Sequence, residues 1–384
     1  MNKTTFSLFF IVLLLINAVS AQDKDTTIKG TVPFELNEHL MIIKGKINGS
    51  QKNYRFVLDT GGLTFVDKDV VEELGLKTRG NMAKMDTLEM GEVTVSDIFA
   101  FTTFNLEAFK KYGILIHGII GSNLLERFVV TLDYRNQKVI LSPDKEDLRE
   151  NVQSYRCRFT NHPVNNAPMI DCTINGNVSL KAMVDTGQPY SIVLPLEYLE
   201  KLNVRNDESL LKSKGAIVSW PGTKTTDSFL LRLDRFEQKD VKINNLMCYF
   251  AELPPLLSVP LLGSDYLSQF LITIDYTRDE ILFVPYEDAR FVKNMFSFGL
   301  NLCKVENNTI VVEGLWTGSP ADRAGFKVGD EIVECNSKVL TGGDIFELRK
   351  LLEKKSANNI NLIVKDEKGK RETSLQKEML LDKR

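Results

Sequence analysis

Two short acidic turns constrain the fold of this chain more than any other feature of its sequence. The apolar run Phe56–Leu58 leads into Asp59-Thr60-Gly61, the apolar run Ala182–Val184 leads into Asp185-Thr186-Gly187, and the two aspartates are 126 positions apart. Aspartate and glycine are common in turns, so one such tripeptide is a weak signal. Two copies that each end an apolar strand predict either two halves of one site or two structural turns inherited through duplication.

A longer repeat surrounds the two turns. Each turn follows a strand-like segment and an Asn-Gly pair, which favours a tight hairpin because both residues tolerate positive φ. The segment FVVTLDY (128–134) recurs as FLITIDY (270–276). Further matching pairs are 117–124 with 260–267 and the helix-like segments 67–76 with 196–202. The sequence therefore predicts a duplicated, strand-rich lobe of roughly 120–140 residues rather than a short-period solenoid.

The N-terminus has the pattern of a secretory signal peptide. Lys3 precedes the largely apolar run Phe6–Ile16, and small residues follow up to Ala21. Cleavage after Ala21 is expected, and the apolar run is about half of the roughly 20 residues that span a membrane. An uncleaved anchor is the alternative. We expect an exported protein, periplasmic or secreted, with no membrane span after cleavage.

Composition excludes several classes of function. A net charge of −3 gives no electrostatic basis for nucleic-acid binding, and 43% apolar with 26% charged residues is typical of a soluble globular protein. Five cysteines are too few for a disulfide scaffold, although Cys157 and Cys172 could pair across a hairpin. With three histidines and no CxxC motif, we expect no metal, no cofactor and no histidine-based triad.

The paired turns have a chemical interpretation. Two lobes related by approximate twofold symmetry would bring Asp59 and Asp185 together on the axis. Two carboxyl groups about 3 Å apart cannot both ionise, so they share a proton, and one acts as base while the other donates. We expect Gly61 and Gly187 to let the backbone turn sharply. Hydrogen bonds between Thr60 and Thr186 would lock the two turns together.

With their downstream partners Ile119-Ile120-Gly121 and Leu261-Leu262-Gly263, the two turns resemble those of the aspartic proteases. The short lobes and the endings FVVTLDY and FLITIDY are most similar to retropepsin-like bacterial members, over residues 36–286. The resemblance implies hydrolysis of a polypeptide substrate without a cofactor. It implies Asp59 and Asp185 as the catalytic dyad, shaped by the residues that follow them, and one chain supplies both halves, so a monomer suffices.

Two positions depart from that family pattern. The residue after the motif is usually small, often Ser, Thr or Ala, whereas this chain has Gly62 and Gln188. The site is therefore expected to be asymmetric, with inactivity as the alternative. In the second lobe, Trp220-Pro221-Gly222 could cap a hairpin over the cleft or simply belong to the core.

A different pattern begins after Pro285. The segment FGLNL, followed by GSPADRAGFKVGDEIVECNSKVL, resembles a PDZ domain of the bacterial protease-associated type, over residues 294–378. The resemblance implies that a peptide C-terminus adds a strand beside Leu300–Lys304, opposite a helix that begins at Asp344 and contributes Phe346. The implied peptide-binding residues are Phe298, Gly299, Leu300, Asn301, Leu302, Leu348 and Leu351. A domain that only packs against the rest is the alternative.

The expected architecture is mainly β: duplicated retropepsin-like acid-protease β-barrel lobes followed by an α+β PDZ domain. The expected boundaries are 1–21 for the signal peptide, 22–150 and 151–290 for the lobes and 294–380 for the PDZ domain. The predicted function is an aspartic endopeptidase whose PDZ domain recruits substrates or regulates cleavage. The alternative is a non-catalytic scaffold that binds peptides.

Overall fold

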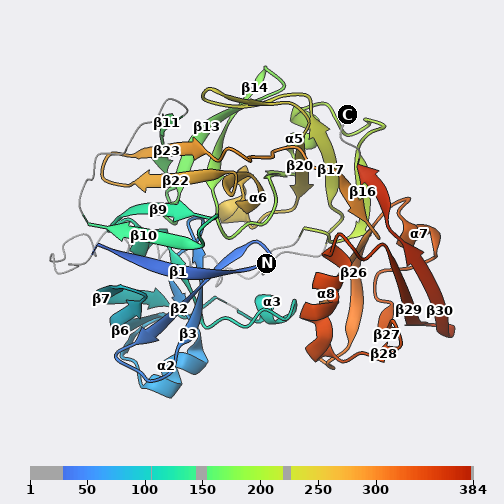
Figure 1. Ribbon diagram of the computed structural model, residues 1–384, viewed down its shortest axis with the longest axis horizontal. Coiled ribbons are helices and arrows are strands. Elements are labelled where there is room, and N and C mark those ends of the chain that lie inside the picture. Colours follow the sequence, from blue (N-terminus) through green and yellow to red (C-terminus); the bar gives the residue numbers. More distant parts are fainter. Residues whose placement is uncertain (1–28, 105, 144–153, 219–225, 382–384) are drawn as a thin grey trace, which may run out of the picture.

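The computed structural model describes residues 29–104, 106–143, 154–218 and 226–381 (Figure 1). The expected signal peptide and the Trp220–Gly222 segment lie outside these ranges. The chain is mainly β, with 48% strand and 12% helix, as predicted. Among the described residues, no helix combines the length and apolar character needed to cross a membrane.

Residues 30–142, here called the first lobe, contain the first hairpin. β2 (Leu40–Ile47) and β3 (Tyr54–Asp59) pair antiparallel, and Asn48 and Gly49 between them have φ values of 50° and 69°. The other elements of this lobe are β1 (Gly30–Asn37), β4 (Phe65–Val66), α2 (Lys68–Leu74), β5 (Thr78–Arg79), β6 (Met82–Met90), β7 (Val93–Phe101), α3 (Glu107–Lys110), β8 (Gly118–Gly121), α4 (Ser122–Leu125), β9 (Val129–Asp133) and β10 (Lys138–Ser142).

Residues 155–285, the second lobe, contain an equivalent hairpin. β13 (Pro168–Ile174) and β14 (Val178–Val184) are joined through Asn175 and Gly176, with φ values of 50° and 73°. The other elements are β11 (Tyr155–Arg158), β12 (Thr160–Asn161), β15 (Ile192–Pro195), α5 (Tyr198–Lys201), β16 (Leu211–Gly215), β17 (Phe229–Leu233), β18 (Phe236–Gln238), β19 (Val241–Ile243), β20 (Leu246–Ala251), η1 (Pro255–Leu257), β21 (Leu261–Leu262), α6 (Ser264–Leu267), β22 (Phe270–Asp275) and β23 (Glu280–Pro285).

One sheet joins the two lobes. Its strands follow the order β1-β10-β9 from the first lobe and β22-β23-β11 from the second, and β9 pairs antiparallel with β22 at the boundary (Figure 1). Thr131 lies opposite Thr273 at the centre of this pairing, with their hydroxyl oxygens 3.0 Å apart. Each lobe therefore contributes three strands in the same order outward from the boundary.

A parallel pairing supports the end of each hairpin. β3 pairs with β8, which places Asp59 opposite Gly121, and β14 pairs with β21, which places Val184 opposite Leu262. α4 and α6 begin directly after β8 and β21. Both acidic turns thus lie between a hairpin strand and a parallel strand that runs into a short helix.

Residues 295–381, the C-terminal unit, continue the sheet of the second lobe. β16 pairs antiparallel with β26 (Ile310–Trp316) over Ser213–Gly215. The chains approach closely here, because a Cβ on Gly314 would lie 2.3 Å from the Ala216 carbonyl oxygen. The other elements are β24 (Met295–Ser297), β25 (Leu300–Lys304), α7 (Pro320–Arg323), β27 (Glu331–Cys335), β28 (Lys338–Val339), η2 (Gly342–Asp344), α8 (Ile345–Glu353), β29 (Asn359–Asp366), β30 (Gly369–Gln376) and β31 (Glu378–Leu381).

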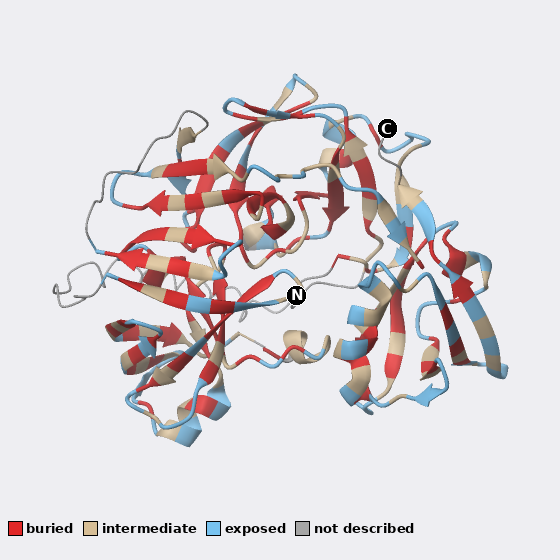
Figure 2. Ribbon diagram, in the orientation of Figure 1, coloured by how far each residue is buried: buried red, intermediate tan, exposed pale blue. Residues whose placement is uncertain are grey.

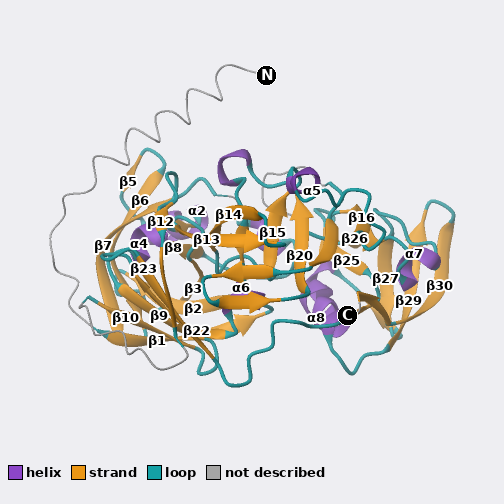
Figure 3. Cartoon of the chain, turned by 90° about the horizontal axis from the view of Figure 1, so that it is seen from above, coloured by secondary structure: helices purple, strands orange, loops and turns teal. Residues whose placement is uncertain are grey.

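The core reflects this organisation. One apolar cluster runs through both lobes and includes the fully buried Phe56 and Phe283, while the C-terminal unit has its own cluster around Phe298 and Ile332 (Figure 2). A third cluster joins Trp316 to Tyr249 of the second lobe. Seen from above, the C-terminal unit lies at one end of the molecule (Figure 3). It is therefore attached both by main-chain pairing and by apolar packing.

The Gly314→Ala substitution tests the attachment at β16. Its methyl group would overlap the Ala216 carbonyl, and we expect overpacking to lower the free energy of unfolding by about 1–3 kcal/mol and to expose the connection between β23 and β24 to protease. Thermal unfolding and limited proteolysis are the measurements. Gly343→Ala is the matched control, because its nearest neighbour would be 3.5 Å away and neither glycine has a positive φ. Equal behaviour of the two variants would contradict the close packing.

Candidate functional site

The two acidic turns face each other. Asp59 is the last residue of β3, and Asp185 follows β14 directly. A Cβ on Gly61 would lie 2.5 Å from Asp185 Cγ, and a Cβ on Gly187 would lie 2.6 Å from Asp59 Cγ. Each glycine therefore lies against the carboxyl group of the opposite turn.

This contact corrects the expected role of the glycines. Neither Gly61 nor Gly187 has a positive φ, so the turns themselves do not demand glycine. Any side chain at either position would occupy the space of the opposite carboxyl group. The sequence pattern pointed to the right residues, but the physical reason is the close approach between the turns.

Four hydrogen bonds tie the turns to each other through two threonines. The Thr60 N–H donates to Thr186 Oγ1 at 3.0 Å, and the Thr186 N–H donates to Thr60 Oγ1 at 3.1 Å. The Thr60 hydroxyl donates to the Val184 carbonyl at 2.6 Å, and the Thr186 hydroxyl donates to the Leu58 carbonyl at 2.9 Å. Both threonines are fully buried. The reciprocal pattern fixes the distance between the two aspartates.

The carboxyl groups have equivalent local partners. The Gly61 N–H donates to Asp59 Oδ1, and the Gly187 N–H donates to Asp185 Oδ1, both at 2.9 Å. These bonds hold one oxygen of each carboxyl group within its own turn.

Burial and mutual proximity dominate the electrostatics of the pair. Asp185 is 8% exposed and Asp59 is partly exposed. Burial raises the pKa of Asp185 well above its usual value, and the neighbouring Asp59 carboxyl group raises it further. Burial also raises the pKa of Asp59, but hydrogen bonds from Asp185 and from main-chain N–H groups act in the opposite direction. The favoured state of the pair therefore has one proton shared between the two carboxyl groups.

Two serines that the sequence analysis did not single out brace the turns from behind. The Ser122 N–H donates to the Gly62 carbonyl at 2.9 Å, and the Ser264 N–H donates to the Gln188 carbonyl at 2.7 Å. Their hydroxyl groups donate to the Gly62 and Thr186 carbonyls, both at 2.9 Å. The signal was available, because a Gly-Ser pair ends the parallel strand in both copies.

Asn165 was also missed. Asn165 is 3% exposed, and its side-chain Nδ2 donates to the Gly61 carbonyl. Its main-chain carbonyl oxygen accepts from the Ser122 hydroxyl. It comes from the loop between β12 and β13 of the second lobe and braces the turn of the first. No local pattern marks it, because the contact joins residues that are 104 positions apart.

The site is asymmetric where the sequence departs from the repeat. A Cβ on Gly62 would lie 2.6 Å from Asp59 Oδ2, so this position admits no side chain. Gln188 is 1% exposed, its Oε1 accepts from the Tyr190 N–H, and that oxygen lies against Gly263. The glutamine side chain is thus held within its own lobe. Its Nε2 has no hydrogen-bond partner among the described residues.

The structure decides the alternatives for the cysteines. All five are unbonded, and Cys157 and Cys172 lie opposite Ile281 and Leu180, not opposite each other. Burial raises the pKa of the Cys157 thiol to about 12, so it stays protonated. Within the described ranges, no three His, Cys, Asp or Glu side chains are grouped as metal ligands.

The predicted peptide-binding residues of the C-terminal unit divide into two groups. Phe298, Leu302 and Leu348 are at most 4% exposed and belong to the apolar core of that unit. The partly exposed members are Leu300, Asn301 and Leu351. Gly299 has a φ of 86° and lies against Ser319.

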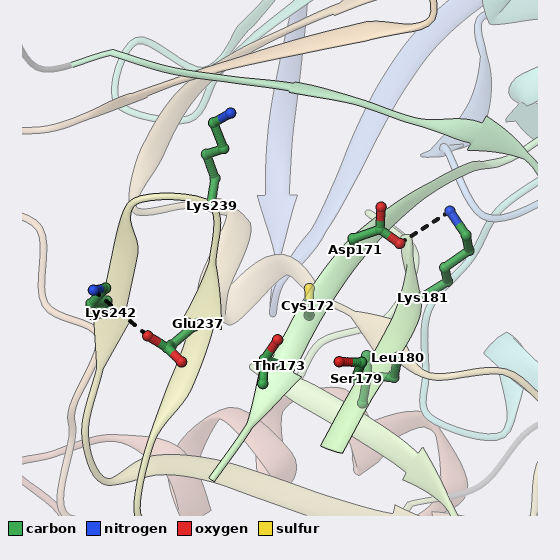
Figure 4. A pocket seen from close by; sticks show the side chains of 9 residues that line it. All are labelled: Asp171, Cys172, Thr173, Ser179, Leu180, Lys181, Glu237, Lys239 and Lys242. Atoms are coloured by element: carbon green, nitrogen blue, oxygen red, sulfur yellow. Dashed lines mark ion pairs between the residues drawn. The ribbon is translucent and has the colours of Figure 1, made fainter. Parts of the chain in front are cut away.

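A surface pocket on the second lobe lies apart from these sites (Figure 4). Its lining includes neither Asp59 nor Asp185. Ion pairs join Lys181 to Asp171 at 3.1 Å and Lys242 to Glu237 at 3.8 Å. Its lining comes from β13, β14, β18 and their neighbours: Asp171, Cys172, Thr173, Ser179, Leu180, Lys181, Glu237, Lys239 and Lys242.

The threonine network predicts the effect of Thr60→Val. The isosteric change leaves the Thr186 N–H and the Val184 carbonyl without partners, and we expect the free energy of unfolding to fall by about 2–4 kcal/mol in urea denaturation. Thr60→Ser keeps the hydroxyl group and should cost about 1 kcal/mol for the lost methyl group. Equal losses for valine and serine would show that the network contributes little.

The raised pKa of Asp185 predicts how Asp185→Asn changes stability with pH. A carboxyl group whose pKa is raised by folding destabilises the native state at pH values above its unfolded pKa. The neutral amide removes that penalty, so the variant should be more stable than wild type at pH 7. The gain should disappear below about pH 4, where the carboxyl group is protonated in both states. Asp171→Asn, at an exposed aspartate, is the control and should show no such trend. A gain independent of pH would contradict the raised pKa.

The comparisons with known proteins bear on the C-terminal unit. Residues 311–366, from β26 through β29, match the family model described as PDZ domain. No curated protein matches the chain. PDZ domains bind extended peptides by adding a strand to a sheet edge. The C-terminal part of the chain therefore contains a PDZ domain, as predicted.

Proposed function

We propose that this chain is an aspartic endopeptidase in which two retropepsin-like lobes share one catalytic dyad, Asp59 and Asp185. The observation that carries the proposal is the convergence of the two turns, in which each glycine lies against the opposite carboxyl group. A structural turn has no reason to place a carboxyl group in such a desolvated position beside a second one, because burial raises the pKa of both and disfavours their charged forms.

The strand pairing supports the two-lobe part of the proposal. The turn-bearing strand pairs in parallel with β8 in the first lobe and with β21 in the second. The boundary sheet takes three strands from each lobe in the same order. These repeated pairings fit a duplicated ancestor whose two copies build one site.

The proposed reaction assigns different roles to the two carboxyl groups. In this proposal Asp59 is the carboxylate that takes a proton from the attacking water. Asp185 holds the shared proton and donates it to the carbonyl oxygen of the scissile peptide. The tetrahedral adduct then collapses, and a proton passes to the departing amine. No covalent intermediate and no cofactor are required.

The remaining parts of the proposal follow the sequence. The PDZ domain recruits polypeptide substrates or regulates cleavage by binding peptide C-termini. The N-terminal segment directs export to the periplasm or the outside of the cell. Because one chain supplies both aspartates, a monomer suffices for catalysis.

A non-catalytic peptide-binding scaffold is the second candidate. The PDZ match favours it, because peptide recognition by that domain needs no dyad. The burial of Gln188 beside the second turn also distinguishes this site from a symmetric dyad. Peptide cleavage decides between the two candidates.

The decisive experiment measures cleavage of a peptide library by the mature chain between pH 3 and pH 8. Asp59→Asn and Asp185→Asn should each lower the rate at least about 1000-fold, because each removes one half of the proton exchange. Activity should fall when the pH rises above the raised pKa of the pair, because the shared proton is lost. It should also fall in stronger acid, where Asp59 becomes protonated.

Asp171→Asn controls for loss of a surface aspartate and should leave cleavage unchanged. Wild type that cleaves nothing across this range, or an Asp59→Asn variant that cleaves as fast as wild type, would exclude the aspartic mechanism and favour the scaffold.

A further inference from the structure

A segment of the first lobe occupies part of the PDZ sheet edge. Among the described strands, β25 pairs only with β26, and its other edge is where an extended peptide would add. On that edge the Lys304 N–H donates to the Lys111 carbonyl at 2.8 Å. This main-chain bond is of the kind that a peptide ligand would make.

The same segment fits closely against α8, the other wall of the groove. Gly113 has a φ of 77°, and a Cβ there would lie 2.8 Å from Phe346 Cβ and 2.9 Å from Ile345 Cγ2. Phe346 packs against the same apolar cluster of the first lobe as Phe109 and Tyr112, and it is not part of the PDZ core. Residues 109–114, here called the groove segment, are therefore seated between the two elements that form the groove.

Side chains of the groove segment bind a buried glutamate of the PDZ domain. Glu313 of β26 is 5% exposed; it forms an ion pair with Lys111 and accepts from the Tyr112 hydroxyl at 2.8 Å. Asn301 of β25 also donates to it, at 3.2 Å. A buried carboxylate needs such partners, so the groove segment stabilises Glu313 as well as covering β25.

Arg349 closes the groove from the helix side. It donates to both carboxylate oxygens of Glu38 at 3.0 and 3.3 Å, and its guanidinium group lies 4.6 Å from the centre of the Tyr112 ring. It also donates to the Leu302 carbonyl at 3.1 Å. Leu302 and Lys304 are two positions apart in β25, so the Leu302 carbonyl and the Lys304 N–H point toward the same edge of the strand. Contacts within the chain thus use both of them.

The groove segment is close in sequence to the candidate site. It leads directly into β8, whose last residue, Gly121, lies opposite Asp59. On the other side, β16 of the second lobe is paired with β26. The PDZ domain therefore contacts both lobes, and its contact with the first lobe lies in its own peptide groove.

We propose that the groove segment is an internal, displaceable occupant of the PDZ groove and that a polypeptide C-terminus excludes it. A bound peptide takes the place of Lys111 on β25 and releases the first lobe from the PDZ domain, while the β16–β26 pairing keeps the second lobe attached. The inference rests on the peptide-binding part of the proposed function and does not depend on catalysis.

The test uses the full mature chain carrying Gly113→Asn. Asparagine tolerates positive φ, but its side chain cannot fit against Phe346, so the groove segment should leave the groove. Gly80→Asn is the matched control, since Gly80 has a φ of 58° and nothing within 4 Å of a Cβ. Phe346→Ala weakens the same contact from the PDZ side without altering the PDZ core.

Two readouts are compared. Hydrogen–deuterium exchange over residues 300–306 should be faster in Gly113→Asn and Phe346→Ala than in wild type and Gly80→Asn. Fluorescence anisotropy with a dye-labelled pool of random decapeptides should show at least tenfold tighter binding to Gly113→Asn than to wild type and Gly80→Asn; Phe346→Ala is compared by exchange alone, because its ring is itself a candidate peptide contact. The pool should carry free C-terminal carboxylates, and an amidated pool should not distinguish these three proteins.

The outcomes separate the inference from the function on which it rests. Equal exchange in all four proteins, or equally tight binding of the carboxylate pool, would overturn the occupancy of the groove while leaving peptide binding intact. Faster exchange in the two groove variants with no peptide bound by any protein would remove the peptide-binding function, and the exclusion with it.

Discussion

The contact between Asp59 and Asp185 is the constraint on which the rest of the structure depends. Two buried carboxyl groups repel each other unless they share a proton, and the surrounding groups must hold them at the distance where sharing is possible. The threonine bonds fix that distance, and the glycines leave room for the opposite carboxyl group. Behind them, Ser122, Ser264 and the parallel strands fix the turns to the rest of each lobe.

The two lobes are equivalent at this contact and diverge around it. Asn165 precedes the Asn-Gly turn of its lobe by ten residues, and Glu38 has the same spacing in the first lobe. Asn165 braces the turn that carries Asp59, whereas Glu38 pairs with Arg349 of the PDZ domain. Corresponding positions thus contact an acidic turn in one lobe and the PDZ domain in the other. Gly62 and Gln188 also differ between the two lobes, each three positions after an aspartate of the pair.

The PDZ domain is more than a neighbour of the lobes. It extends the sheet of the second lobe through β26 and encloses a segment of the first lobe between β25 and α8. Glu313 is buried, Arg349 and Glu38 are partly buried, and all three are paired, so any rearrangement must supply new partners for Glu313 and Arg349. Under the proposed displacement, peptide binding at the PDZ domain has a physical route to the strand that carries Asp59.

The sequence by itself determined most of the local structure. The Asn-Gly hairpins, the helix α2 and the repeated strand series follow from turn chemistry and periodicity, which act over a few residues. It also identified both aspartates and the PDZ domain, because these have compact motifs. Only the tertiary structure showed why Gly61 and Gly187 must be glycine, that Asn165 braces the first turn, that Leu348 points into the core, and that residues 109–114 lie in the PDZ groove. Each of those facts depends on a contact between segments far apart in the chain, and such contacts leave no pattern in the local sequence.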